Sequence, residues 1–153
     1  STQKLTLNDF GIKTGNNQTS TSFAQFSVDY WVSGFNFFKT NFNKNVNNYL
    51  IISASTIDTT ADILLALRYQ QTLFDICEIY TRHFRKALSE NRKKILFNIQ
   101  FVDEQNQIAL TNFTKRRVAY DSETNSGTNI EKQIQWETTI KKELEALSEF
   151  SNE

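Results

Sequence analysis

The chain has 153 residues, of which 39% are hydrophobic and 13% aromatic, and its 17 basic and 17 acidic side chains give zero formal net charge. This length corresponds to one domain of ordinary size, and this composition excludes an intrinsically disordered chain. No apolar run is long enough for a transmembrane helix, and the balanced charge argues against a dedicated nucleic-acid or membrane-surface protein. A single cysteine excludes an internal disulfide and a cysteine-based metal site.

The first third of the chain is predicted to form short strands. Apolar and polar residues alternate over 26–33, which is the period of a strand with one buried face. Residues 49–53 have an apolar centre that suits a buried strand, residues 5–10 indicate another short one, and the aromatic and asparagine-rich stretch 35–48 indicates a hairpin. The connections are too short for crossover helices, so the expected sheet is small and antiparallel.

A long helix is predicted over residues 59–91. Asp58 is a favourable N-cap residue, and Asp62 then lies in the first turn, where the helix dipole favours a negative charge. Apolar residues recur from Ile63 to Leu88 at steps of three and four, as on the buried face of a helix.

The remainder is predicted to be mainly helical. Residues 95–101 fit either a helix or a strand, and residues 108–120 fit a helix. Asn125-Ser126-Gly127 marks a break, and the apolar spacing after Ile130 predicts a last helix that ends at about Glu149. The sequence therefore predicts a single α+β domain over 1–153, with strands over about 1–57 and helices over about 58–153.

Two stretches resemble one protein family. Residues 67–82 read Leu-Arg-Tyr-Gln-Gln-Thr-Leu-Phe-Asp-Ile-Cys-Glu-Ile-Tyr-Thr-Arg, and residues 120–127 read Tyr-Asp-Ser-Glu-Thr-Asn-Ser-Gly, followed by Gln133 and Trp136. They are similar to the active-site helix and the downstream segment of bacterial secreted zinc-dependent proteases, known as domain of unknown function 922. Those patterns read roughly Leu-x-His-Glu-Gln-x-His-Phe-Asp-Ile-x-Glu-x-Tyr-Ala-Arg and Tyr-Asp-x-x-Thr-x-His-Gly. Residues 5–10 are a weaker match to the family's opening Leu-x-Trp-x-Asp-Phe.

The resemblance implies a zincin-type helix whose chemical residues are replaced. In the family, two histidines four residues apart share a zinc ion, and the glutamate between them activates the metal-bound water. Those positions are Tyr69, Gln70 and Leu73 here, and the downstream histidine is Ser126. Leu73 cannot bind a metal, and the amide of Gln70 cannot act as a general base. We therefore expect no catalytic residue, no metal ligand and no cofactor.

The other residues of the motif are retained, in contrast to those that would bind zinc or activate water. The retained residues are Asp75, Glu78 and Arg82 in the helix and Tyr120, Asp121, Thr124 and Gly127 downstream. If the resemblance is real, Tyr69 and Leu73 share one helix face toward a groove, because they are four residues apart, and Ser126 approaches them.

The expected function is therefore that of a degenerate zincin-like protein. The resemblance implies a catalytically inactive binding or scaffold domain of a bacterial cell-envelope or secreted protein, and the absence of methionine fits a processed chain. The expected partner is a protein or a cell-envelope component. We expect no nucleic-acid partner and no transmembrane segment in this chain. Two alternatives stay open: a hydrolase with a noncanonical site around Asp75, Glu78 and His83, or a structural assembly subunit.

Several polar features also have structural interpretations. Asp75, Glu78 and Arg82 lie on adjacent turns and fit an ion-pair network as well as an acidic site floor. Cys77 lies among apolar residues and fits a small buried side chain. The basic residues of 82–94, with 115–117 expected nearby, fit a solvated helix end or a patch for an acidic partner.

Overall fold

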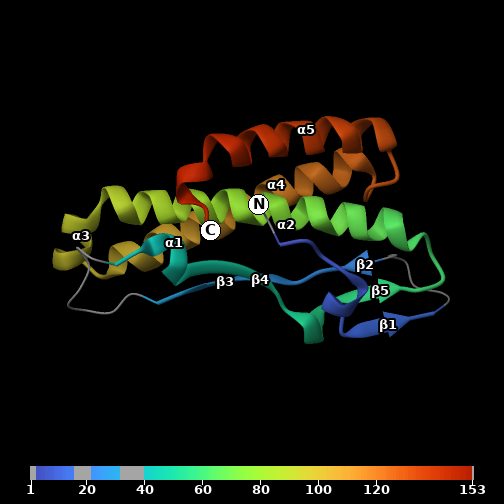
Figure 1. Ribbon diagram of the computed structural model, residues 1–153, viewed down its shortest axis with the longest axis horizontal. Helices are drawn as coiled ribbons and strands as arrows, with labels where there is room; N and C mark the ends of the chain where they lie inside the picture. Colours follow the sequence, from blue (N-terminus) through green and yellow to red (C-terminus); the bar gives the residue numbers. More distant parts are fainter. Residues whose placement is uncertain (1–2, 16–21, 32–39, 153) are drawn as a thin grey trace.

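The computed structural model describes residues 3–15, 22–31 and 40–152. Its architecture is α+β, as the sequence predicts, with a few short strands followed by long helices (Figure 1). The strands and helices in chain order are β1 (Ile12–Thr14), β2 (Ser22–Phe23), β3 (Phe26–Tyr30), α1 (Phe42–Asn45), β4 (Val46–Leu50), β5 (Thr56–Asp58), α2 (Ile63–Glu90), α3 (Arg92–Phe97), α4 (Gln100–Thr124) and α5 (Ile130–Ala146). Three short 3₁₀ turns complete the set, at Leu7–Asp9, Ile52–Ala54 and Ser148–Phe150.

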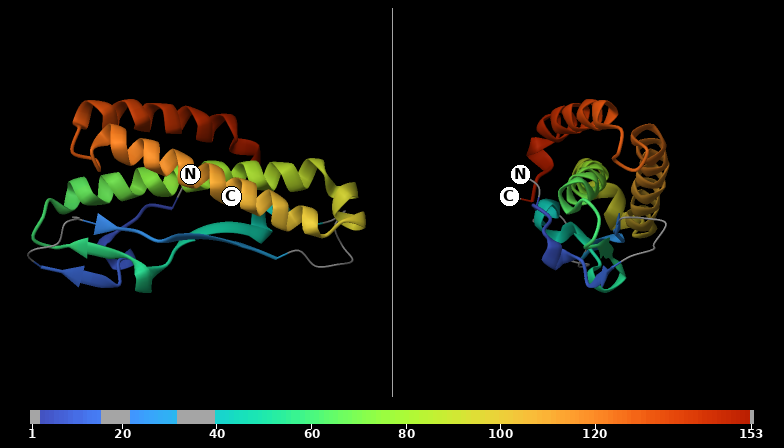
Figure 2. Two further views of the ribbon diagram at one scale, coloured as in Figure 1. Left: turned by 180° about the vertical axis from the view of Figure 1, so that it is seen from behind. Right: turned by 90° about the vertical axis from the view of Figure 1, so that its right-hand side faces the viewer.

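Helix α2 is the central element of the fold. The strands lie on one side of it, and α4 and α5 cover the rest, as the end-on view in Figure 2 shows. The helix begins at Ile63, four residues after the predicted start, because Asp58 instead ends β5 and accepts hydrogen bonds from the Thr60 amide and hydroxyl at 2.8 and 2.6 Å. Asp62 is the N-cap, and its carboxylate accepts from the Leu65 amide at 3.0 Å.

The strands form two small sheets. The two-stranded sheet is antiparallel and pairs Phe26 with Leu50 and Tyr30 with Val46. In the three-stranded sheet, ordered β1-β5-β2, β5 runs antiparallel to β2 but parallel to β1. The expectation of a wholly antiparallel sheet is therefore wrong for β1, because the chain reverses direction twice before β5, once between β1 and β2 and again between β3 and β4.

Two further strand predictions need correction. Residues 5–10 contain a 3₁₀ turn instead of a strand, since the Asp9 carboxylate caps it by accepting from the Thr6 amide at 2.7 Å. The strand expected over 49–53 ends at Leu50 and is followed by another 3₁₀ turn. The part of the predicted strand and hairpin that falls on residues 32–39 lies outside the described residues.

The helices after α2 pack around two apolar clusters. The larger cluster includes Leu73, Phe74 and Tyr120, and the smaller one includes Phe84 and Ile95. The ambiguous segment 95–101 is helical, with α3 turning the chain from α2 into α4 at one end of the elongated molecule (Figure 1). Among the described residues, no helix combines the length and the apolar character needed to cross a bilayer.

Candidate functional site

Tyr69 of α2 packs against the end of α4. Its ring stacks on that of Tyr120, with centroids 5.3 Å apart and planes 14° from parallel. Its hydroxyl donates a hydrogen bond to the Asp121 carboxylate. Burial, followed by this hydrogen bond, raises the pKa of Tyr69 far above its ordinary value, so the phenol stays protonated and neutral.

Gln133 of α5 connects these residues to a third helix. The Tyr120 hydroxyl donates to Gln133 Oε1 at 2.6 Å, and Gln133 Nε2 donates to Thr72 Oγ1 at 3.0 Å. Gln133 is completely buried, so this amide can satisfy its polar atoms only through the protein. We call Tyr69, Tyr120, Asp121 and Gln133 the tyrosine cluster.

The turn after α4 closes over Tyr69. Asn125, Ser126 and Gly127 all have positive φ, at 47°, 53° and 86°. Thr124 stabilises the turn, because its hydroxyl donates to the Tyr120 carbonyl at 2.7 Å and accepts from the Gly127 amide at 3.1 Å. A Cβ atom on Gly127 would lie 2.8 Å from Tyr69 Cβ, so this close approach requires glycine. The downstream segment thus lies beside Tyr69 at Gly127, the residue after Ser126.

The four positions that match the family's chemical residues in the motif are occupied by three buried side chains and one exposed serine. Tyr69 is only 7% exposed and Leu73 is completely buried, so side chains fill the groove expected at this face. Gln70 is also buried, and its Nε2 donates to Ser22 Oγ at 3.0 Å. Ser126 is exposed on the turn. No solvent-open groove separates Tyr69 from the turn.

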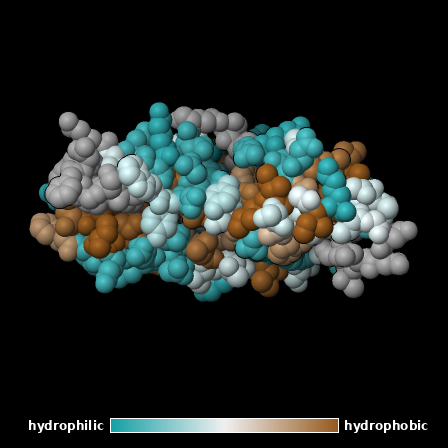
Figure 3. All heavy atoms as spheres, turned by 90° about the horizontal axis from the view of Figure 1, so that it is seen from below, coloured by the Kyte–Doolittle hydropathy of each residue, from teal (hydrophilic) through white to brown (hydrophobic). Residues whose placement is uncertain are grey.

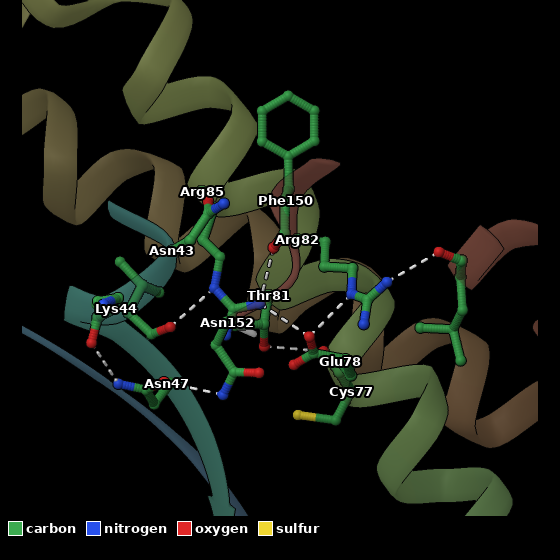
Figure 4. A network of polar contacts seen from close by, with 12 residues as sticks. Asn43, Lys44, Asn47, Cys77, Glu78, Thr81, Arg82, Arg85, Phe150 and Asn152 are labelled. Carbon is green, nitrogen blue, oxygen red and sulfur yellow. Dashed lines mark hydrogen bonds and ion pairs between the residues drawn. The ribbon is translucent and has the colours of Figure 1, made fainter. Parts of the chain in front are cut away.

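A second polar cluster lies farther along α2. The carboxylate oxygen Oε1 of Glu78 accepts from Arg82 Nε and from Arg85 Nη1, both at 2.8 Å (Figure 4). All three side chains are buried, and we call them the arginine cluster. The guanidinium groups also donate to the backbone carbonyls of Leu144 and Phe150, at 2.8 and 2.9 Å. Glu78 and Arg82 therefore form the ion-pair network that their spacing indicates.

Asp75 and His83 do not join this cluster. Asp75 lines an open groove beside α5, and Gln71 Nε2 donates to its carboxylate at 3.0 Å. His83 is exposed next to Tyr80, and partial desolvation together with Lys86 lowers its pKa. Over residues 3–15, 22–31 and 40–152, no three histidine, cysteine, aspartate or glutamate side chains are placed so that they could hold a metal ion.

Cys77 is buried at the centre of α2. It belongs to the larger apolar cluster and is almost inaccessible to solvent. Burial raises the pKa of its thiol to about 12. A thiol in this state is not a nucleophile at neutral pH, so Cys77 acts as a small apolar side chain.

A groove of about 590 Å³ runs between α2 and α5, and no sequence pattern predicts it. Ile140 and Leu144 supply apolar surface, and Asp75, Glu137 and Lys141 supply charges of both signs. Arg68 forms a bidentate ion pair with Glu137 at 2.6 and 2.8 Å, which holds the two helices together. Burial alone would raise the pKa of Glu137, but hydrogen bonds from Arg68 and Gln133 outweigh it, so that pKa is lowered.

Comparison with known proteins gave no match: neither a family model, nor a curated protein, nor a solved structure is similar to this chain. The relation to zinc-dependent proteases therefore stays a prediction from the motifs.

Proposed function

We propose that this chain is a catalytically inactive, zincin-like domain of a bacterial cell-envelope or secreted protein, which acts by binding a partner or as a scaffold. The observation that carries the proposal is the tyrosine cluster. Tyr120, Asp121 and Gly127 belong to the retained downstream motif, and they meet at Tyr69, the position of the family's first zinc histidine. Two segments about fifty residues apart in sequence are in contact at that position, and this contact supports the proposal.

The loss of catalysis in this proposal follows from the residues at the former site. The Tyr69 hydroxyl is held by Asp121, and Gln70 is held by Ser22. Leu73 belongs to the core. None of these side chains offers a free imidazole or a titrating carboxylate, which zinc binding and water activation require.

The binding role rests on the groove between α2 and α5. Its apolar surface is interrupted by carboxylates and by cations, among them Arg82 and Lys141. A polypeptide segment presents the same mixture of apolar side chains and charges, so the groove suits a protein partner better than a single small ion. The contacts of Glu78 do not favour the hydrolase, because this carboxylate is already neutralised by two arginines.

The test is to rebuild the metal site. Tyr69→His, Gln70→Glu, Leu73→His and Ser126→His together restore the zinc-site residues that the resemblance implies. We expect this quadruple variant to bind zinc in calorimetry at neutral pH, and the unchanged chain to carry no stoichiometric zinc in elemental analysis. We expect a zinc affinity below that of a natural site. Residues that orient the metal ligands typically change metal affinity 10–100-fold, and the unchanged chain has no zinc ligands for such residues to orient.

The controls separate failure of the site from failure of the fold. The double variant Tyr69→His, Leu73→His should bind zinc more weakly than the quadruple variant, and far-ultraviolet circular dichroism should show both to be folded. A folded quadruple variant that binds zinc no better than the unchanged chain would mean that these positions do not converge as in a zincin. One zinc ion per unchanged chain after dialysis would contradict the loss of the metal site.

A further inference from the structure

Bulky apolar side chains are concentrated at the end of the molecule formed by α3. Phe97 is 91% exposed, and Leu96 and Ile99 are also exposed. Other exposed apolar residues of the described chain include Ile12 and Ile52 near β1 and Ile130 and Ile134 on α5, and Figure 3 shows a further hydrophobic area away from this end. Three such residues within four positions form a patch, and Figure 3 shows hydrophobic residues at the surface of this end.

The same end carries three basic residues in one short segment. Residues 91–102 include Arg92, Lys93 and Lys94 and no aspartate or glutamate, and Glu90, Asp103 and Glu104 flank the segment. Lys93 and Lys94 are exposed and line a shallow depression of about 300 Å³ together with Phe97 and Phe101. The two lysines are therefore next to the exposed apolar side chains, a local arrangement that the zero net charge of the whole chain does not reveal.

Trp31 extends the exposed aromatic surface at this end. It is 71% exposed and follows Tyr30, whose hydroxyl donates to Asp103 in the first turn of α4 at 2.5 Å. Its amide donates to Asn45 at the end of α1. Arg92 of α3 stacks over Phe42 of the same short helix, with its guanidinium carbon 4.5 Å from the ring centre. Trp31 and α3 are thus linked through α1 and α4.

We propose that the α3 tip, residues 92–101, docks on the surface of a lipid bilayer that contains anionic phospholipids. The tip consists of the short helix α3 and the turn after it, at one end of an elongated molecule (Figure 1), and the exposed side chains of Leu96, Phe97 and Ile99 can enter the interfacial region of a bilayer. Lys93 and Lys94 then lie at the level of the phosphate groups, which their ammonium groups attract. This inference does not rest on the proposed function, because it uses none of the residues of the α2-α5 groove or the tyrosine cluster.

The experiment measures binding of the whole chain to vesicles of one part phosphatidylglycerol to two parts phosphatidylcholine by cosedimentation. We expect binding that weakens at high salt and is much weaker on pure phosphatidylcholine. Lys93→Gln with Lys94→Gln should weaken it about 20-fold, at about fivefold for each lysine near an anionic surface. Phe97→Ser should weaken it by at least about tenfold, because it removes a phenylalanine side chain that is buried in the bilayer when the chain is bound. Vesicles with brominated acyl chains should quench the fluorescence of Trp31.

Matched variants elsewhere on the surface complete the test. Leu64→Ser removes an 80% exposed apolar residue at the opposite end of α2, and Lys132→Gln with Lys142→Gln removes two exposed lysines of α5. Both control variants should bind as the unchanged chain does. If the Phe97→Ser variant is unfolded, Ile99→Ser is tested in its place. Absence of vesicle binding by the unchanged chain overturns the proposal, and it is the result expected if a protein binds at this tip. Equal binding by the tip variants and the control variants also overturns the proposal.

Discussion

Helix α2 carries two buried polar clusters that are stabilised in different ways. The tyrosine cluster contains two phenols, one amide and a single carboxylate, Asp121, which is partly exposed and lies 3.8 Å from the Arg117 guanidinium. The arginine cluster contains two cations and one carboxylate, so it has an excess positive charge in the interior. Backbone carbonyls compensate for that excess, among them the Val46 oxygen, which accepts from Arg85 Nε at 2.8 Å.

This difference predicts how the two clusters respond to substitution. A hydrogen bond between neutral groups, such as that from Tyr120 to Gln133, can be removed without leaving a buried charge. Removal of one member of a buried ion network leaves an uncompensated charge and costs much more. Glu78 and Arg82 are therefore expected to be needed for stability.

The largest effect is expected from Glu78→Gln. This change leaves the buried guanidinium groups of Arg82 and Arg85 without an anion, and it should lower the free energy of unfolding by about 3–5 kcal/mol. Chemical denaturation at neutral pH measures it. Glu90→Gln is the matched control, since Glu90 forms an exposed ion pair with Lys86 at 3.9 Å. This change should lower the free energy of unfolding by less than about 1 kcal/mol. Equal, small effects for both variants would show that Glu78 is not needed to compensate the arginines.

A smaller effect is expected at Leu73, which matches a zinc ligand in the motif and lies in the core. Leu73→Ala should lower the free energy of unfolding by about 2–5 kcal/mol, because Leu73 is completely buried and the change leaves a cavity. Leu64→Ala on the same helix serves as the control, because its side chain is exposed and its loss should be nearly neutral. A loss below about 1 kcal/mol for Leu73→Ala would indicate an open groove at this face instead of a packed one.

The sequence predicted the helical part of the fold better than the strands. Apolar spacing identified α2 and α5, and Asn125-Ser126-Gly127 marked the turn, because these signals are local. Asp58 was misjudged as an N-cap because Asp62 satisfies the same local rule, and only the pairing of β5 with β1 decides between them. Strands of two or three residues depend on distant partners, so short windows of sequence do not define them.

The candidate site was predictable to the same extent. The motif placed Tyr69 and the 120–127 segment together, and the structure brings them into contact. The burial of Gln70 against Ser22 had no local signal, because the two residues are 48 positions apart. The α2-α5 groove likewise depends on how two distant helices pack, which their separate periodicities do not define.

The smallest effect concerns the hydroxyl of Tyr69 and tests the neutral character of its cluster. Tyr69→Phe keeps the ring stacked on Tyr120 and removes only the hydrogen bond to Asp121. A hydrogen bond to a charged group contributes about 1.5–3 kcal/mol, and the lower value applies here because the Asp121 side chain is 35% exposed. We therefore expect a loss of about 1.5 kcal/mol in denaturation at neutral pH.

The pH dependence of this difference distinguishes a buried, neutral phenol from an exposed one. The folded state raises the pKa of Tyr69 above the ordinary 10.0, so above that pH the unfolded chain releases the proton first and holds fewer protons than the folded chain. Stability contributed by this group is then complete below pH 10 and falls as pH rises toward the folded pKa. The phenylalanine variant has no such loss, whereas Tyr120 and Cys77 titrate in both proteins and cancel in the comparison. The advantage of the unchanged chain over Tyr69→Phe should therefore shrink as pH rises above about 10, and a constant difference would mean that the hydroxyl titrates as freely in the folded chain as in the unfolded one.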